Sequence, residues 1–363
     1  MKNERQVVEE RSFQGIRYYR ISDDTLTHPR GTVIFPDAVD QGGHLFTVWG
    51  FPRIKRVYVL ERGFRRFFKT APFYLEEKLD GYNVRLVHVA DRILALTRGG
   101  FVCPYTTEWA ELWAERFGLR EFFADYPDHV LCGEALGDSP YNAQRPLELP
   151  PGLHFFLFEI MTPQGTRLLP EEKYDLAARY AIPTVPQLGK YTVDQMDEIR
   201  RLLLEINERG GEGIIAKSED GERMVKYVTP TSDLEDVRDN LPILFDLDSG
   251  YFTNRLLRAT LFIQEFDLDE EEYARRIGRS ILDGWRILRN YRESAEEYHI
   301  LVRNIRTWEQ LQELLGTRVR VEEMYQRAVL LDGRPFIRVG FKRVFRKSTK
   351  RFRMILKGYG HYD

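Results

Sequence analysis

The spacing of apolar positions changes along this chain and divides it into four stretches. Up to about residue 60 the apolar residues come in short runs between turns, such as GTVIF before PDAVDQGG, which predicts a small β-rich domain. From about 232 to 316 they take the three-and-four spacing of helices, and after 317 strand-like runs return. We therefore expect four domains, at 1–60, 61–231, 232–316 and 317–363.

The stretch 61–231 mixes β-prone runs with two helices. Its strands are predicted at LVHV, ILALT, HVLCGEAL, LHFFLFEI, GIIAK and RMVKYV. One helix is predicted over about 106–117. The other covers about 193–208, where Thr192 and Gln195 suit a capping box. A run of strands with helices on the outside predicts an α+β fold with mostly antiparallel sheets.

The helical stretch carries one long apolar face. Its members share helical spacing: Tyr273, Ile277, Ile281, Trp285 and Leu288. Such a face predicts a partner surface, which could belong to a second copy of the chain or to the chain's own body. A further short helix is predicted between Thr307 and Gly316.

Composition narrows the class of protein. The chain has 363 residues, of which 43% are hydrophobic and 30% charged, as in a globular protein of two to four domains. No apolar run approaches the ~18 residues that span a membrane, and the first residues, MKNERQVVEERSF, lack the apolar segment of a secretory signal. Cys103 and Cys132 are far apart and lack metal-ligand spacing. A cytoplasmic protein without disulfides and without a membrane partner is therefore expected.

Charge is distributed unevenly. The net charge is −2, but residues 334–357 hold ten Lys and Arg and no acid, so the remaining chain has a net charge of −12. A cationic segment on an acidic body predicts a polyanionic partner. Phe336, Phe341, Phe345 and Phe352 are interleaved with the cations, which suits a basic hairpin that binds nucleic-acid backbones. A solvated hairpin with a buried aromatic face is the alternative, and both can hold at once.

One glycine-rich stretch imitates a nucleotide-binding loop. GEGIIAKS at 211–218 differs by one residue from a phosphate-binding loop, with Ala216 in place of a glycine. Such loops run from a strand through the glycines into a helix. Here a predicted helix precedes the glycines and an apolar strand follows, so this interpretation is rejected.

Six short motifs follow one another from residue 78 to residue 227. They read K-x-D-G-x-N at 78–83, T-R-G-G at 97–100, G-E at 133–134, F-L-F-E at 156–159, E-G-I-I-A-K at 212–217 and V-K-Y at 225–227. Taken singly, each has an ordinary explanation: KLDG occurs in many turns, and strand phenylalanines are usually core. Together, in this order, they resemble the covalent nucleotidyltransferases, namely DNA ligases, RNA ligases and mRNA capping enzymes.

The finer resemblance is to RNA ligases. Asn83, five residues after Lys78, is similar to several RNA ligases, whereas DNA ligases usually carry arginine there. FPRIKRVYVLERGF…FYLEEKLDGYNVR resembles the archaeal homodimeric RNA ligases, which join and circularise single-stranded RNA. The resemblance covers nearly the whole chain, with specific motifs in 50–231. It implies a nucleotidyltransferase catalytic domain of ATP-grasp-like antiparallel sheets, a β-rich N-terminal domain, a helical dimerisation domain and a small basic C-terminal domain.

The resemblance also implies substrates and catalytic roles. ATP and Mg²⁺ (or Mn²⁺) are expected, with 5′-phosphorylated single-stranded RNA as partner. Lys78 would attack the α-phosphorus of ATP, and Lys226 would neutralise charge that develops on the α-phosphate. Glu212 would bind the metal. A lysine at its reference pKa is almost entirely protonated at pH 7, so the site must lower the pKa of Lys78.

Further roles are carried over by position. Glu134 is expected to accept a hydrogen bond from a ribose hydroxyl, and Arg98 to reach the ribose or a phosphate. Phe158 is expected to stack on adenine, with Phe156 as the fallback. Asp80 would hold Lys78 or help with the metal.

The remaining candidates concern the base and the RNA. Glu76 and Glu77 are expected to read the adenine edge by main chain or carboxylate. Asn83 is assigned to the nucleotide, the surroundings of the lysine or the RNA 5′-phosphate. Arg85 is assigned to the RNA 5′-phosphate or to the surroundings of the lysine, with a solvated strand residue as the alternative. The other RNA-binding candidates are cations of the basic segment: Arg338, Lys342, Arg343, Arg346 and Lys347.

One position departs from the family. The last motif often has two lysines in a K-x-K pattern, and Met224 stands in place of the first. Lys217 could compensate, but strict strand alternation would place it on the face opposite Glu212 unless a bulge intervenes. Both arrangements remain open.

Two other functions fit parts of the pattern. DNA ligases and capping enzymes share the motifs, but they continue into an OB-fold where helices are predicted here. An RNA-binding scaffold without catalysis would lack a motif lysine or acid, and Lys78, Glu134 and Glu212 are all present. We therefore predict an ATP-dependent RNA ligase that joins 5′-phosphate and 3′-hydroxyl ends through lysyl-AMP and RNA-adenylate intermediates.

Overall fold

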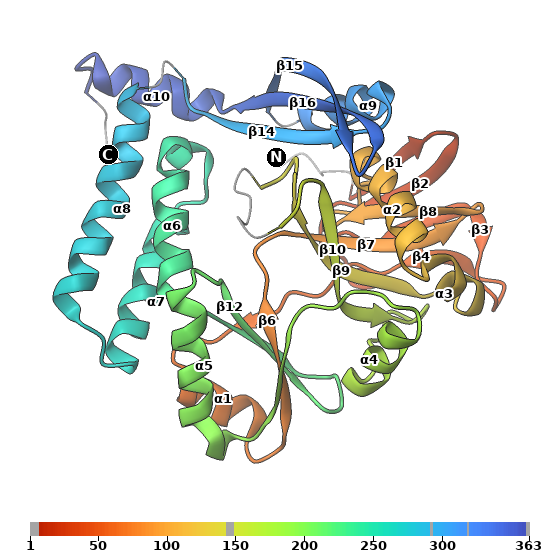
Figure 1. The fold of residues 1–363 in the computed structure, drawn as a ribbon, viewed down its shortest axis with the longest axis horizontal. Helices are drawn as coiled ribbons and strands as arrows, with labels where there is room; N and C mark the ends of the chain where they lie inside the picture. Colours follow the sequence, from red (N-terminus) through yellow and green to blue (C-terminus); the bar gives the residue numbers. More distant parts are fainter. Residues whose placement is uncertain (1–6, 143–148, 291–292, 318, 361–363) are drawn as a thin grey trace.

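The computed structural model describes residues 7–142, 149–290, 293–317 and 319–360 (Figure 1). Four sheets are present in this part of the chain, and nearly all strand pairs are antiparallel. The exception is β5 (Lys55–Arg56), which pairs parallel to β13 (Met224–Val228). The expected α+β class with mostly antiparallel sheets is confirmed.

The first sheet is N-terminal and has the order β1-β2-β3-β4. Its strands are β1 (Val8–Phe13), β2 (Ile16–Ile21), β3 (Val33–Val39) and β4 (Leu45–Val48). The sheet packs face to face on the second sheet, where Phe35 and Val48 meet Val87 and Leu94 in one buried cluster. The β-rich N-terminal region thus forms one layer of a larger unit, which we call the catalytic body and which also contains the second and third sheets.

The second sheet has the order β10-β9-β7-β8. Its strands are β7 (Tyr82–Val89), β8 (Arg92–Thr97), β9 (Val130–Gly137) and β10 (Leu153–Met161). Alternate residues of β7 face opposite ways, so Val84 and Leu86 pack under α2 (Pro104–Arg116) and α3 (Leu119–Asp125), while Val87 faces the N-terminal sheet.

The third sheet carries the lysine of the first motif and has the order β11-β6-β12-β13-β5. Its remaining strands are β6 (Phe73–Lys78), β11 (Gln187–Tyr191) and β12 (Gly213–Ser218). Phe73 and Leu75 turn toward α1 (Leu60–Phe68) and α5 (Met196–Glu208) in a buried cluster. Alternation therefore sends the side chains of residues 74, 76 and 78 to the other face.

The helix expected over 193–208 forms as a 3₁₀ turn (Val193–Gln195) followed by α5, and both hydrogen bonds of the Thr192–Gln195 capping box are made. The helix expected over 106–117 is α2. The helix α4 (Pro170–Arg179) lies between β10 and β11.

The helical stretch is shorter than expected. It contains α6 (Pro230–Asn240), a 3₁₀ helix (Leu241–Asp246), α7 (Tyr251–Glu265) and α8 (Glu270–Asn290). A strand then follows, β14 (Ala295–Val302), which pairs with β16 (Arg334–Val344) and so belongs with the C-terminal sheet. The boundary placed at 317 therefore does not match the sheet, because β14 and α9 (Ile305–Gly316) lie before it.

The C-terminal basic segment is not a hairpin of its own. β16 is the central strand of the order β14-β16-β15 and forms its hairpin with β15 (Arg320–Leu331), after which residues Arg346–Leu356 form the helix α10. The aromatic residues of the segment are buried, as expected: Phe336, Phe341, Phe345 and Phe352.

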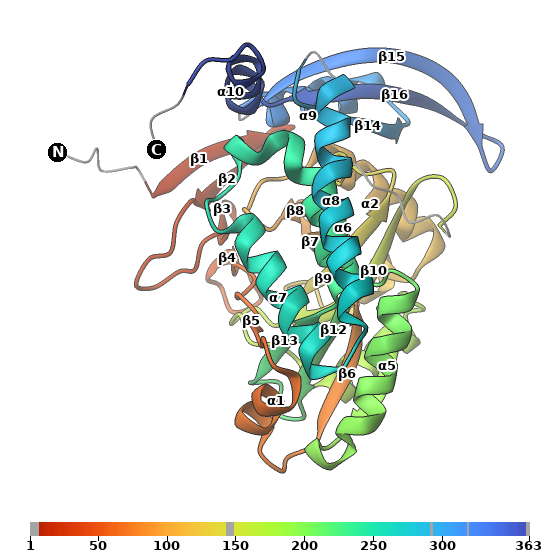
Figure 2. The same ribbon diagram turned by 90° about the vertical axis from the view of Figure 1, so that its left-hand side faces the viewer.

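The apolar face of α8 packs mostly on the chain's own body. Tyr273 and Leu288 are buried, and Trp285 lies edge-on to Phe352 of α10 with ring centroids 6.3 Å apart. Ile281 remains 40% exposed. Figures 1 and 2 show α8 standing beside α6 and α7 and meeting α10 at its upper end.

The C-terminal sheet is fastened to the catalytic body through α2. Glu108 accepts hydrogen bonds from Arg303 N (2.6 Å), Asn304 N (3.2 Å) and Thr307 Oγ1 (2.6 Å) at the start of α9. The neighbouring Trp109 donates to the Leu301 carbonyl. These contacts hold the C-terminal sheet across the top of the molecule (Figure 2).

Candidate active site

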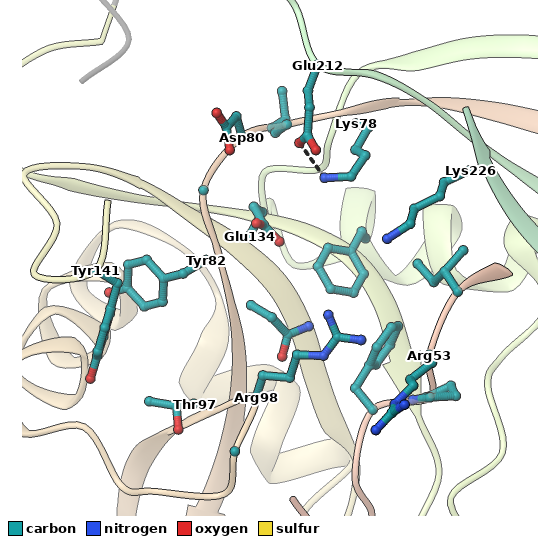
Figure 3. Close-up of a pocket in the computed structure, with 18 of the residues that line it drawn as sticks. Arg53, Lys78, Asp80, Tyr82, Thr97, Arg98, Glu134, Tyr141, Glu212 and Lys226 are labelled. Atoms are coloured by element: carbon teal, nitrogen blue, oxygen red, sulfur yellow. Dashed lines mark hydrogen bonds and ion pairs between the residues drawn. The ribbon is translucent and has the colours of Figure 1, made fainter. Parts of the chain in front are cut away.

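A cavity of about 1140 Å³ lies between the second and third sheets. It collects residues from every motif identified in the sequence, together with residues of the N-terminal region and of the C-terminal sheet. Figure 3 shows Lys78, Glu212 and Lys226 on one side of this cavity, and Arg98 and Arg53 on the other. The sequence-predicted residues that line it are Glu76, Glu77, Lys78, Asp80, Asn83, Arg98, Glu134, Phe158, Glu212, Lys217, Lys226 and Arg343.

Lys78 ends β6, directly opposite Gly213 of β12. Its Nζ forms an ion pair with the Glu212 carboxylate, and both side chains are mostly buried. Burial by itself lowers the pKa of Lys78, but the charges of Glu212 and Glu134 outweigh burial, so the net pKa lies above its usual value. In the ligand-free site Lys78 is therefore an ammonium, whereas attack on phosphorus needs the neutral amine.

Gly213 settles the position of Lys217. Its φ is +145°, and a Cβ there would lie 2.1 Å from the Tyr227 carbonyl oxygen, so only glycine fits. This backbone breaks the alternation between residue 212 and the strand that follows. Glu212 and Lys217 consequently both point into the cavity, and Lys217 lies in register with Met224 on β13.

Two further carboxyl groups stand near Lys78. Burial, reinforced by the Glu212 charge, raises the pKa of Asp80 to about 7 at the cavity rim. Burial raises the pKa of Glu134 to about 8, with Lys78 opposing and Glu212 and Asp80 adding to the rise. Such shifts mark negative charge that is not fully neutralised.

The carboxylates suit a magnesium ion that is shared with substrate. Mg²⁺ usually takes one or two carboxylates and completes its shell with water and phosphate oxygens. Glu212, Asp80 and Glu134 all line the cavity and offer hard oxygen donors. In the described residues, no group of three or more His, Cys, Asp or Glu side chains is placed to hold a metal ion.

Lys226 faces the same space from β13. Its pKa is lowered to about 8 by burial first and then by the charges of Arg56 and Lys78. Arg56 is in register with Lys226 on the neighbouring parallel strand. Cations crowded together in a partly buried site are suited to an anionic ligand.

Phe158 forms an aromatic wall of the cavity with Phe51, whose ring lies edge-on at 5.2 Å between centroids. The pairing of β10 with β9 shifts between Leu157 and Glu159, so Phe158 sits in a β-bulge. Phe158 lines the cavity and Phe156 does not, so the first choice for stacking fits better than the fallback.

Two buried lysines fix this bulge. Lys173 and Lys217 both donate to the Phe158 carbonyl oxygen, at 3.1 Å and 2.5 Å. They also pair with the Glu76 carboxylate. Burial opposes ionisation of Glu76, but the two lysines hold its pKa down at about 2.

The expected carboxylate contacts of Glu76 and Glu77 with adenine are not supported. The carboxylate of Glu76 is occupied by Lys173 and Lys217, and a hydrogen bond from Tyr174 adds to them. Glu77 points to the other face of β6, where it pairs with Arg209. The main chain of these residues still borders the cavity. Of the two expected contacts with adenine, the main-chain contact therefore stays a prediction.

Arg85 does not contact RNA, and it is not solvated either. Its side chain is fully buried and donates to the carbonyl oxygens of Trp49 (2.5 Å), Gly31 (2.8 Å) and Thr97 (3.0 Å). Burial lowers the pKa of Arg85 to about 10, so it remains charged at pH 7. It is a structural cation. Its complete burial contradicts a solvated strand residue, and its guanidinium is taken up by loop carbonyl oxygens, which leaves it unsuited to an RNA phosphate or to Lys78.

Asn83 lies in register with Glu134 and lines the cavity. Its Oδ1 atom is buried and finds no hydrogen-bond partner among the described residues. A buried amide oxygen without a donor is costly, so this oxygen is suited to a ligand group.

The basic C-terminal residues are divided between roles. Lys342 is paired with Glu293 and Glu322, and Arg338 is half-buried. Arg346 and Lys347 are exposed on α10. Arg343 lines the cavity. Its Nη1 donates a hydrogen bond to Tyr298 Oη at 3.0 Å.

Sequence reasoning missed Lys173, which lies buried behind the cavity as a partner of Glu76, and several residues that line the cavity itself. Lys173 lies on an amphipathic helix outside all motifs, where the sequence predicts a solvated lysine. Its complete burial and its pairing with Glu76 are seen only in the structure. Phe51, Arg53 and Arg30 come from the N-terminal region, for which the pattern predicted strands and no site. For the two arginines, the only sign in the sequence of a place in the site was a basic residue that follows an apolar strand.

Comparison with known proteins gives a consistent result. Residues 71–228 match the RNA ligase family, and residues 240–359 match the family described as the ligase Pab1020 C-terminal region. A curated, functionally uncharacterised protein of Methanocaldococcus jannaschii is 29% identical over 288 residues, which are 77% of this chain and 70% of that protein.

Solved structures match over the whole chain. One from Aquifex aeolicus, described provisionally as an ATP-dependent DNA ligase, is 32% identical with a TM-score of 0.87, and the match covers 98% of this chain and 97% of that chain. An archaeal ATP-dependent RNA ligase is 27% identical with a TM-score of 0.85, and the match covers 98% of this chain and 94% of that chain.

These matches confirm the family that the motifs predicted, and with it the fold class and the enzyme class. Both family matches name ligases, and together they extend from β6 through α10. The full-length similarity to the archaeal enzyme accounts for the N-terminal sheet and the helices, which the motifs do not cover. The chain belongs to the family of ATP-dependent RNA ligases that includes this archaeal enzyme.

Proposed function

We propose that this protein seals the 5′-phosphate and 3′-hydroxyl ends of single-stranded RNA, within one strand or between two, with ATP as co-substrate. One observation carries the proposal: Lys78, Glu134, Phe158, Glu212 and Lys226 come from separate strands or their ends and meet in one cavity. A lysine nucleophile, a ribose acceptor, a base-stacking ring, a metal ligand and a phosphate-binding cation are the groups that nucleotidyl transfer requires.

The first step is formation of lysyl-AMP. The neutral Nζ of Lys78 forms a P–N bond to the α-phosphorus of ATP, the bond from that phosphorus to the bridging oxygen breaks, and pyrophosphate leaves. If Glu212 bound a divalent cation, Lys78 would lose its ion-pair partner, and burial would then lower the pKa of Lys78 toward neutrality. Mg²⁺ or Mn²⁺, held by Glu212 with Asp80 or Glu134, would neutralise phosphate charge. Lys226 adds positive charge beside the α-phosphate.

The nucleoside would lie beside Lys78, on the side away from the metal and Lys226. Phe158 would stack on adenine, with Phe51 behind it. Glu134 accepts from a ribose hydroxyl in its ionised state. Asn83, whose Oδ1 lacks a donor, would take a hydrogen bond from the nucleotide or from the lysine's surroundings.

AMP then passes to the RNA 5′-phosphate, and a 3′-hydroxyl displaces it to close the strand. The exposed cations Arg346 and Lys347 on α10, together with Arg343 at the cavity, suit the sugar–phosphate backbone. Arg338 and Lys342 are half-buried and would contribute less, Lys342 because it is already paired with two acids.

A labelling experiment tests this function. Incubation with ATP labelled at the α-phosphate should give a covalent enzyme–AMP adduct, and label should then pass to a 5′-phosphorylated RNA oligonucleotide. Lys78→Ala should form no adduct, because no amine replaces the nucleophile. An adduct on the Lys78→Ala protein would contradict the assignment.

A DNA ligase is the second candidate, since the similar Aquifex aeolicus structure carries that description. The two differ in substrate: transfer to RNA ends at least tenfold faster than sealing of nicked duplex DNA is expected. The reverse order would favour the DNA ligase.

We also propose that the protein is a homodimer and cytoplasmic. Leu257, Ile281 and Leu282 leave apolar surface on α7 and α8, and both cysteines are unpaired and buried, as suits a reducing compartment. Light scattering at low micromolar concentration should give twice the chain mass; the mass of one chain would contradict the dimer. Among the described residues, no helix is both long and apolar enough to cross a membrane.

A further inference from the structure

Three arginines from three separate loops line the cavity on the side away from Lys78. They are Arg30, after β2; Arg53, after β4; and Arg98, at the end of β8. Figure 3 shows Arg98 and Arg53 opposite Lys78 and Glu212, with Glu134 between. Arg30 and Arg53 are exposed, with 77% of the Arg53 side chain accessible, and Arg98 is partly exposed.

One buried cation holds the three loops together. Arg85 donates to the carbonyl oxygens of Gly31, Trp49 and Thr97, which lie next to or near Arg30, Arg53 and Arg98 in the chain. Three carbonyl groups on one guanidinium fix the relative positions of the loops, because moving any of them would leave a buried polar group unpaired.

The loops also touch directly. A Cβ at Gly31 would lie 2.3 Å from the Arg98 carbonyl oxygen, and a Cβ at Gly50 would lie 2.3 Å from the Arg30 carbonyl oxygen. Gly31 has a φ of +86°. Backbones at this separation place the three arginines on a rigid support, which is how a preorganised binding site is made.

The positive charge of this cluster is only partly balanced. Asp24 lies 3.6 Å from Arg53 and accepts a hydrogen bond from the Arg30 backbone. Within the described part of the chain, no carboxylate is within ion-pair distance of Arg30 or Arg98. Burial lowers the pKa of Arg98, the charge of Glu134 opposes this, and the charges of Arg53 and Arg30 lower the pKa further, so the three cations lie close to one another.

We propose that Arg30, Arg53 and Arg98 form a phosphate site that serves twice in one catalytic cycle, first for the β-phosphate of ATP and then for the 5′-phosphate of RNA. The inference rests on the proposed ligase function. In phosphoryl transfer the entering and leaving groups are in line. Pyrophosphate therefore leaves on the side of the α-phosphorus opposite the Lys78 Nζ, and the RNA 5′-phosphate must attack from that same side when Lys78 is displaced.

The chemistry of the cluster fits both ligands. Guanidinium groups bind phosphate oxygens with two parallel hydrogen bonds. The RNA end arrives from solvent, where Arg30 and Arg53 are exposed. Arg98 lies deeper, near Glu134, and its charge is felt by Lys226, so the cluster continues into the reaction centre.

The test uses the full chain with Arg30→Ala and Arg53→Ala combined. Both the reverse of the first step (release of ATP from enzyme–AMP by pyrophosphate) and transfer of AMP to 5′-phosphorylated RNA should slow by about 10- to 100-fold, the range expected when charge-assisted hydrogen bonds are lost. The matched control is Arg62→Ala with Arg66→Ala, two exposed arginines of α1 outside the cavity, with the same change in charge. If neither half-reaction slowed, or if only one of them did, the shared site would be overturned.

A binding measurement tests the sharing without chemistry. On the Lys78→Ala protein, inorganic pyrophosphate should displace a 5′-phosphorylated RNA oligonucleotide but not the same oligonucleotide with a 5′-hydroxyl, and the added Arg30→Ala and Arg53→Ala changes should abolish this difference. Equal displacement of both oligonucleotides would reject the site. If the wild-type protein formed no enzyme–AMP at all, the proposed ligase function would fail instead, and the two failures are thereby distinguished.

Discussion

At Lys78 two opposing effects set the protonation state. Burial favours the neutral amine and the pairing with Glu212 favours the ammonium, and the pairing dominates in the ligand-free chain. The proposed nucleophile is thus protonated in the ligand-free chain. In the mechanism that we propose, it would react only once substrate and metal had engaged Glu212.

Glu134 gives a prediction at the scale of one residue. Its pKa of about 8 is above the ordinary value of 4.5, so the folded chain retains a proton that the unfolded chain releases between these pH values. The free energy of unfolding due to Glu134 therefore falls as the pH rises from about 4.5 to 8. Glu134→Gln cannot ionise, and it should be more stable than the wild type at pH 8 by roughly 3–5 kcal/mol, with little gain at pH 4.5, while adenylylation is lost.

Urea unfolding at the two pH values measures the difference. The exposed Glu111→Gln on α2 is the control and should show no pH-dependent gain. Equal stability of Glu134→Gln and wild type at pH 8 would contradict the raised pKa.

Single residues also show where sequence reasoning stops. Lys78, Glu212 and Lys226 were predictable because a motif places them and the strands that carry them are regular. Arg85 was not, because a charged residue on a predicted strand gives no sign of its burial, and its three carbonyl partners come from loops far away in sequence. The carboxylate contact expected of Glu76 failed for the same reason, because its partner Lys173 lies 97 residues away.

At the scale of elements, β12 depends on Gly213. Its φ of +145° and the 2.1 Å approach to the Tyr227 carbonyl oxygen allow Glu212 and Lys217 to face the cavity together. Gly213→Ala should destabilise the chain by roughly 3 kcal/mol or more and remove enzyme–AMP formation, because Glu212 can no longer reach Lys78.

Gly210→Ala provides the matched control for that change. Gly210 has a φ of +76° with no atom near an added Cβ, so only the backbone preference is lost, about 1 kcal/mol. Chemical denaturation and labelling with ATP measure both variants. Similar stability of the two would show that the contact with Tyr227 relaxes freely.

The predicted strands and helices were mostly right because their apolar spacing is regular. The failures lie at the C-terminal end. AEEYHILV carries two leading acids that obscure the β pattern of β14, and the cations of RKSTKRF lie on one helix, α10, where the charge run suggested a hairpin. Neither a β-bulge such as that at Phe158 nor a break such as that at Gly213 has a sequence signal beyond the glycine itself.

At the scale of the whole molecule, Glu108 joins the catalytic body to the C-terminal sheet. Its carboxylate holds three donors at the start of α9. Glu108→Ala would leave these donors unsatisfied, at a cost of about 1–3 kcal/mol, and should loosen the sheet that carries Arg343 to the cavity. Faster limited proteolysis between α8 and β14 and slower AMP transfer to RNA are expected.

Glu111→Ala on the exposed face of the same helix is the control for this change. It should leave the proteolysis rate unaltered. If Glu108→Ala also left it unaltered, the packing of Trp109 on the sheet would by itself be enough to hold the C-terminal region.

The order of strands in the third sheet has a consequence for synthesis of the chain. β6, which carries Lys78, lies between β11 and β12, and neither neighbour has been made when β6 leaves the ribosome. At about 5–20 residues per second, the nascent strand waits roughly ten seconds for β11 and then β12 to emerge, and both of its edges are unpaired until β11 has been made. During this interval a growing polypeptide is open to association with other chains, and chaperone demand should be concentrated there. The strand that carries Lys78 can therefore pair only late in the synthesis of the chain.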